Sequence, residues 1–235
     1  MSDFEMPTLM MVSHGNSGIG GDPAGDLARS VAADWNGPVS HGYMRSNPSL
    51  PDQLASLKRS GHAERLIIFP LFFSEGYLVF EELPRDLERA GLGDAVVLPP
   101  ALNLPGFDDL VASKIRAAAA NRRWRLDEMS VFLVPHGLKT LTAPLPETVR
   151  FARQVQGLCA GPEICIGNIE GKPSLADWRD LSTHKKTLII PMLAGGGTHA
   201  REDPHRQLTG QVVIAGARLT HRLRRTPRRR HRTRL

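Results

Sequence analysis

Short apolar runs alternate with longer amphipathic stretches along most of the chain. The strand-like runs cover residues 8–13, 39–44, 65–69, 95–99, 130–134, 163–167 and 187–191, with 211–216 as a candidate eighth. The helix-like stretches cover residues 24–35, 51–60, 80–90, 106–121, 146–157, 174–181 and 200–208. Strands that are apolar throughout and separated by helices are typical of parallel sheets covered on both faces. The pattern therefore predicts doubly wound α/β architecture.

The second half of the chain repeats the first. HGYMRSNPSLP (41–51) matches IGNIEGKPSLA (166–176), and LIIFPLFFSEGYLVFEELP (66–84) matches LIIPMLAGGGTHAREDP (188–204). Upstream, MMVSHGNSG (10–18) matches VFLVPHGLK (131–139). A repeat of this length indicates two tandem, duplicated parallel-sheet domains.

We predict an N-terminal domain over residues 1–123, a C-terminal domain over 124–217 and an arginine-rich tail over 218–235, with the polar segment 121–128 as the linker. The helix 106–121 is expected to close the first copy. The second copy has no such helix after its last strand.

The basic character of the chain comes from its tail. The net charge is +6, but residues 218–235 hold nine arginines and no acid, and the remaining residues hold 21 basic against 24 acidic side chains. No aromatic residues lie between these arginines to stack on bases. We therefore expect an unstructured end and no nucleic-acid partner, with a nucleic-acid arm as the alternative.

The chain carries no sign of secretion or membrane insertion. Its two cysteines, Cys159 and Cys165, form no CxxC pair, which favours a reducing compartment. No apolar run reaches the ~18–20 residues of a membrane span, and the first residues lack the basic and apolar regions of a signal peptide. We expect a cytoplasmic protein without membrane association.

Three potential metal ligands follow three strands of the second copy. His136 follows strand 130–134, Glu170 follows strand 163–167, and His199 lies after strand 187–191. Ligands of open α/β sheets bind outside the carboxyl ends of the strands, where these residues should gather. A lone histidine is more often structural, but three donors at equivalent strand ends favour a site. Two imidazoles and a carboxylate suit Co²⁺, Fe²⁺, Ni²⁺ or Zn²⁺.

A run of glycines precedes the last of these ligands. Gly195, Gly196 and Gly197, followed by Thr198, would let the backbone approach a bulky ligand closely. Neither GxGxxG nor GxxxxGK[ST] is present, so a nucleotide site is poorly supported.

The first copy keeps only part of this set. His14 repeats the place of the first histidine, but Arg45 stands where Glu170 is and Leu78 where His199 is. An arginine and a leucine cannot complete a divalent-metal site, so His14 is a candidate remnant. Arg45 could bind substrate carboxylates with its planar guanidinium or be a solvated surface charge.

These motifs resemble a known family. The strand ending in HG, the strand followed by IEGKPSL and the block IIPMLAGGGTHAREDP are similar to class II tetrapyrrole chelatases, most closely the CbiX/SirB type of sirohydrochlorin chelatase, over residues 8 to about 205. The resemblance implies two duplicated α/β domains facing a central cleft. It also implies a lyase-class chelatase that inserts cobalt or iron into sirohydrochlorin or a related tetrapyrrole, in cobalamin or siroheme biosynthesis.

Carried over by the resemblance, the metal-binding and catalytic residues are His136, Glu170 and His199, with His14 as a remnant. The substrate-binding candidates are Arg45, Gly195, Gly196, Gly197 and Thr198, and further cations that could meet substrate carboxylates are Lys139, Lys172 and Arg201. No organic cofactor is implied, and the metal (Co²⁺, Fe²⁺ or Ni²⁺) is itself a substrate. The alternative is a catalytically inactive metal- or tetrapyrrole-binding protein of the same fold.

Overall fold

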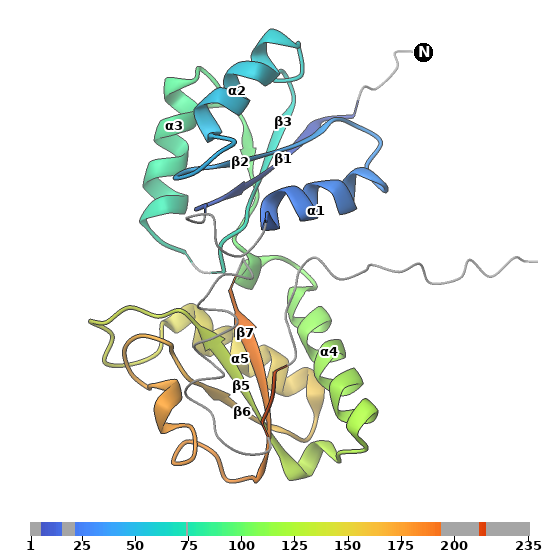
Figure 1. Cartoon of the computed structure of the whole chain (residues 1–235), viewed down its shortest axis with the longest axis vertical. Coiled ribbons are helices and arrows are strands. Elements are labelled where there is room, and N and C mark those ends of the chain that lie inside the picture. Colours follow the sequence, from blue (N-terminus) through green and yellow to red (C-terminus); the bar gives the residue numbers. More distant parts are fainter. Residues whose placement is uncertain (1–5, 16–21, 74, 194–211, 215–235) are drawn as a thin grey trace, which may run out of the picture.

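The chain forms two parallel four-stranded sheets (Figure 1). The computed structural model describes residues 6–15, 22–73, 75–193 and 212–214. The first sheet has the order β2-β1-β3-β4 and consists of β1 (Thr8–Ser13), β2 (Val39–Tyr43), β3 (Leu66–Pro70) and β4 (Val96–Val97). The second has the order β6-β5-β7-β8 and consists of β5 (Met129–Pro135), β6 (Glu163–Ile166), β7 (Lys186–Met192) and β8 (Val212–Ile214). The predicted fold class and the fourth strand of the second sheet are confirmed.

The two sheets repeat each other in local geometry as well as in strand order. The Asn47–Pro48 and Lys172–Pro173 peptide bonds are both cis. In each copy, an isolated β-bridge joins a residue at the start of the loop to the serine after the proline. Tyr43 pairs with Ser49, and Asn168 pairs with Ser174. The repeated PSL motif therefore forms the same loop after β2 and after β6, which confirms the predicted duplication.

Three helical segments cover the first sheet, and we call β1–β4 with these segments the first unit. They are α1 (Pro23–Ala32), α2 (Leu50–Arg59) and the continuous run of η1 (Leu78–Glu82) and α3 (Leu83–Arg89). Asp22 caps α1 through the Gly25 N–H, and Ser49 caps α2 through the Asp52 N–H. The segment predicted as one helix over 80–90 begins with a π-helical turn. Pro84 has no N–H to donate to the preceding turn, which explains why regular α-helix starts only beside it.

The long helix α4 (Phe107–Arg122) packs on the second sheet rather than the first. Phe107, Val111 and Ile115 share one core with strands β5 and β7, and α4 also contacts α5 (Pro146–Cys159) (Figure 1). The expectation that this helix closes the first copy is therefore wrong. Its apolar face shows that it packs on a sheet but not on which one. We call β5–β8 with α4 and α5 the second unit.

The opposite face of the second sheet is covered by irregular chain. The expected helix over 174–181 is only a 3₁₀ turn, Leu175–Asp177, followed by hydrogen-bonded turns. Trp178 turns back onto Phe132 and Val134 of the sheet, which buries the segment without a regular helix. The expected helix over 200–208 lies outside the described residues. Within the described part of the chain, every helix is too short or too polar to cross a membrane.

Candidate active site

A histidine follows the central strand of each sheet. His14 comes directly after β1 and His136 directly after β5. In each, ring Nδ1 lies near the carbonyl oxygen of the following glycine, at 3.3 Å for Gly15 and 3.1 Å for Gly137. A carbonyl oxygen only accepts, so the tautomer that makes this hydrogen bond carries its proton on Nδ1 and its lone pair on Nε2. In that tautomer, Nε2 of each ring is the atom suited to binding a metal or a proton.

The backbone of Glu170 lies beside that of His136. The Glu170 N–H donates to the His136 carbonyl oxygen at 2.7 Å, and Gly137 bridges to Glu170 in β geometry. The carboxylate is about one third exposed (33%) and lies 3.9 Å from the Lys139 ammonium. The contact with Lys139 is at the outer limit of an ion pair and leaves the carboxylate accessible.

Arg45 occupies the equivalent place beside His14 but is paired. Its N–H donates to the His14 carbonyl oxygen at 2.9 Å, and its guanidinium meets both carboxylate oxygens of Glu82 at 2.5 and 2.7 Å. The bidentate contact with Arg45 lowers the pKa of Glu82 and raises that of Arg45. Arg45 is not among the residues that line the cavity described next. Its role in binding substrate therefore stays a prediction.

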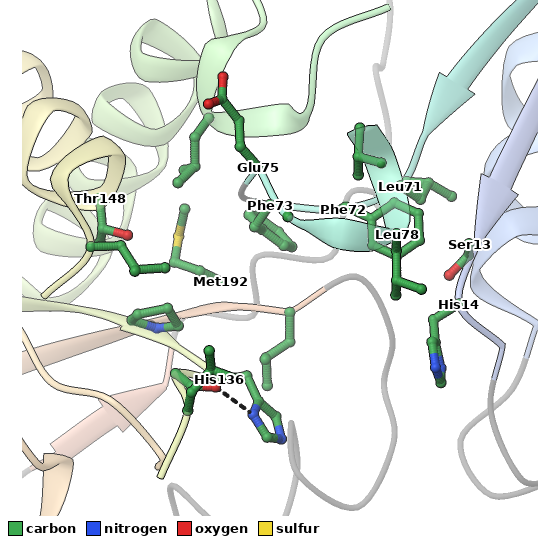
Figure 2. Close-up of a pocket in the computed structure, with 18 of the residues that line it drawn as sticks. Ser13, His14, Leu71, Phe72, Phe73, Glu75, Leu78, His136, Thr148 and Met192 are labelled. Atoms are coloured by element: carbon green, nitrogen blue, oxygen red, sulfur yellow. Dashed lines mark hydrogen bonds between the residues drawn. The ribbon is translucent and has the colours of Figure 1, made fainter. Parts of the chain in front are cut away.

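A cavity of about 620 Å³ opens between the carboxyl edges of the two sheets, and both histidines line it (Figure 2). Its volume falls in the range of about 300–1,000 Å³ that is usual for small-molecule sites. The first unit contributes the wall after β3, and the second unit contributes the β5 rim and the end of β7. The lining is mostly apolar and includes Leu71, Phe72, Phe73, Tyr77, Leu78, Leu138, Leu145 and Met192. This is a shared pocket for a large, partly apolar ligand.

The chain is similar to class II chelatases in sequence and in structure. The CbiX family model matches residues 8–113, and the structure of CbiX described as the terminal enzyme of siroheme biosynthesis in denitrifying bacteria is similar over 89% of this chain and 90% of that one, with a TM-score of 0.65 and 25% identity. The chain is therefore similar to the CbiX family of class II chelatases. No curated protein matches it in sequence.

More distant structures share the chelatase fold. SirB from Bacillus subtilis, solved with Fe³⁺, is 14% identical over 90% of this chain and 88% of its own, with a TM-score of 0.66. A multi-domain protein from Deinococcus radiodurans is 17% identical with a TM-score of 0.68; the match covers 92% of this chain but 52% of that one. At these identities the likeness concerns the fold alone.

Some of the predicted site residues lie outside the described residues. Gly195, Gly196, Gly197, Thr198 and His199 fall there, directly after the cavity-lining end of β7. Among the described residues, no three His, Cys, Asp or Glu side chains are grouped closely enough to hold a metal ion. The predicted set of two histidines and a glutamate therefore stays a prediction.

Several residues that line the cavity were not predicted from the sequence. Glu75 and Thr148 line the wall, and so does Asn168, which is almost fully buried (2% exposed) and donates to the Lys172 carbonyl oxygen at 2.9 Å. Asn168 could have been found, because it begins the repeated loop whose later residue Glu170 was identified. Nothing in the local pattern marks Glu75 or Thr148.

Proposed function

We propose that this chain inserts a divalent metal ion into sirohydrochlorin or a related tetrapyrrole, as a lyase-class chelatase. The observation that carries the proposal is the shared cavity, with apolar walls and one histidine from each unit. Apolar walls suit the faces of a macrocycle, and imidazoles suit both partners of the exchange, a metal ion and a proton. The similar CbiX is described as an enzyme of siroheme biosynthesis, and SirB has been solved with Fe³⁺ and with cobalt.

In this proposal, the second unit holds the incoming metal. A backbone hydrogen bond joins Glu170 to His136, which supports their acting as a pair, although His136 lines the cavity and Glu170 is not among its lining residues. His199 would complete the set from the loop after β7. Borderline N/O donors of this kind bind cobalt, iron and nickel alike, so supply would decide which ion is used.

The first unit would contribute macrocycle contacts and a base. Metal insertion releases two pyrrole N–H protons, while the electron pairs stay on nitrogen and bind the metal. His14 lines the cavity, while the neighbouring Leu78 and the paired Arg45 cannot complete a metal site around it. An imidazole can accept these protons and return them to water. His14 then acts as a proton acceptor rather than a metal ligand.

The test is an anaerobic insertion assay with sirohydrochlorin and Co²⁺, Fe²⁺ or Ni²⁺, followed by the absorption of the metallated product. The wild-type chain should exceed the spontaneous rate, and His14→Ala, which removes the proposed base, should reduce its rate about 10²–10⁴-fold, the usual contribution of a general base. His136→Ala, which removes a proposed metal ligand, should also lose most of its turnover. His62→Ala is the matched control, because His62 is exposed at the opposite end of β1 from His14. Saturable binding of macrocycle and metal without turnover would instead support the inactive binding protein.

A further inference from the structure

A chain of polar side chains connects the cavity wall of the first unit to a helix of the second. Glu75, which lines the cavity after β3, accepts a hydrogen bond from the Asn103 side-chain amide at 2.5 Å. The amide oxygen of Asn103 accepts in turn from the Arg150 guanidinium at 3.1 Å. Asn103 ends the 3₁₀ helix η2 (Ala101–Asn103), and Arg150 lies on α5. The chain of contacts thus spans a loop of one unit, the connection between the units and a helix of the other.

Asparagine is well suited to the middle position. Carboxylates accept and guanidinium groups only donate, so the connecting side chain must donate at one end and accept at the other. A primary amide does both within one planar group. Aspartate at the same place would repel Glu75, and an apolar residue would leave both charged neighbours without this link.

An apolar bridge runs alongside the polar one. Phe73 comes from the same loop as Glu75, and its ring centroid lies 6.0 Å from that of Phe107 on α4. The Phe107 ring centroid lies 5.5 Å from that of Phe151 on α5. Phe73 belongs to the core of the second unit although it follows β3 of the first. The loop between β3 and α3 is therefore held by two contacts with the opposite unit.

This loop carries much of the apolar cavity wall. Phe72, Phe73, Tyr77 and Leu78 all line the cavity and lie within a few residues of Glu75. Figure 2 shows the Glu75 carboxylate pointing away from both His14 and His136. That orientation makes Glu75 a poor candidate for proton transfer and a good one for anchoring the wall.

We propose that Asn103, bridging Glu75 and Arg150, is a positioning residue that sets the affinity of the cavity for the macrocycle. The inference rests on the proposed function. The bridge is separate from His136 and Glu170, so it should act on macrocycle binding and leave metal binding alone. Without the Asn103 bridge, the loop after β3 keeps its aromatic contact with the second unit but loses its polar one. The cavity walls of the two units then no longer hold a fixed spacing around a flat ligand.

The experiment measures two dissociation constants on the full chain: that of metal-free sirohydrochlorin, by absorption titration, and that of Co²⁺ without macrocycle. Asn103→Ala and Glu75→Ala should each weaken sirohydrochlorin binding about tenfold, the order expected for the loss of one hydrogen bond. Co²⁺ binding should not change, and in turnover KM should rise while kcat stays within about twofold of wild type. Glu75→Gln should bind like wild type, because its amide oxygen still accepts from Asn103.

Asn121→Ala, on the exposed surface of α4, is the matched control and should behave as wild type. Unchanged sirohydrochlorin affinity in Asn103→Ala would overturn the inference. The inference would also be overturned if Glu75→Gln bound sirohydrochlorin as weakly as Glu75→Ala. Affinity would then depend on the charge of Glu75 and not on its hydrogen bond with Asn103. A parallel loss of Co²⁺ affinity would also contradict it. A wild-type chain that binds no sirohydrochlorin would refute the proposed function instead.

Discussion

The turn after β5 offers a sharp test, because Gly137 directly follows His136 and packs against the backbone of Glu170. Its φ is +73°, in the left-handed region that side chains disfavour. A Cβ added there would overlap the carbonyl oxygen of Glu170 and approach the Asn168 Cβ to 2.8 Å. Gly137→Ala must therefore push the His136 turn away from the loop that carries Glu170.

Two costs add in this variant. A left-handed alanine costs about 1–2 kcal/mol, and overlap in a packed region costs about 1–3 kcal/mol more. We expect the free energy of unfolding to fall by about 2–5 kcal/mol. The displaced turn should also weaken Co²⁺ binding about 10–100-fold, the range typical of lost support around a metal site.

Gly61→Ala is the matched control. Gly61 has a nearly identical φ of +75°, but a Cβ there would meet nothing within 4 Å. It should lose only the conformational part, about 1–2 kcal/mol, and keep full Co²⁺ affinity. Urea unfolding and Co²⁺ titration measure both quantities. If the two variants prove equal in stability and in metal affinity, the close packing of the turn against the 168–170 loop is not what holds the site.

Three further substitutions test separate parts of the account. Leu78→His adds an imidazole to the cavity wall of the first unit, which His14 also lines, and equilibrium dialysis should detect a second Co²⁺ per chain; an unchanged stoichiometry would contradict the assignment of a remnant site. Phe107→Ala should lower the free energy of unfolding by about 3–5 kcal/mol in urea, whereas Leu110→Ala, on the same helix but 38% exposed, should cost far less. Burial raises the pKa of Glu163, but hydrogen bonds from a serine and a threonine outweigh it and hold that pKa below its ordinary 4.5. The stabilisation is therefore present above pH 4.5 and lost as the pH falls through the lowered pKa, so Glu163→Gln should flatten acid unfolding curves in that range; curves that superimpose would refute this.

The sequence predicted the sheets and the duplication well because their signals are local. Each strand is a short apolar run bounded by turn residues, and the repeated HG and PSL motifs specify the same turns twice. The sheet on which α4 packs could not be predicted from such local signals. Its buried positions, such as Val111 and Ile115, identify an amphipathic helix, and only the three-dimensional packing decides which sheet it covers.

The candidate site, like the fold, could be predicted only in part. The proximity of Glu170 to His136 follows from parallel topology, because neighbouring strands bring their carboxyl ends together. The pairing of Arg45 with Glu82 could not be predicted, since the two residues are 37 positions apart and on different elements. Cavity-wall residues such as Phe72 and Leu138 resemble ordinary core or loop residues in sequence, and only the facing of the two units makes them a pocket.

The most direct test of the central claim is the initial rate of Co²⁺ insertion into sirohydrochlorin by the wild-type chain and by His136→Ala, His199→Ala and His14→Ala, each with Co²⁺ affinity measured in parallel. The account predicts that all three variants lose most of their turnover. It also predicts that His136→Ala and His199→Ala lose Co²⁺ affinity, while His14→Ala binds Co²⁺ as tightly as wild type. Loss of Co²⁺ binding in His14→Ala, with His136→Ala unaffected, would place the metal in the first unit and contradict the account.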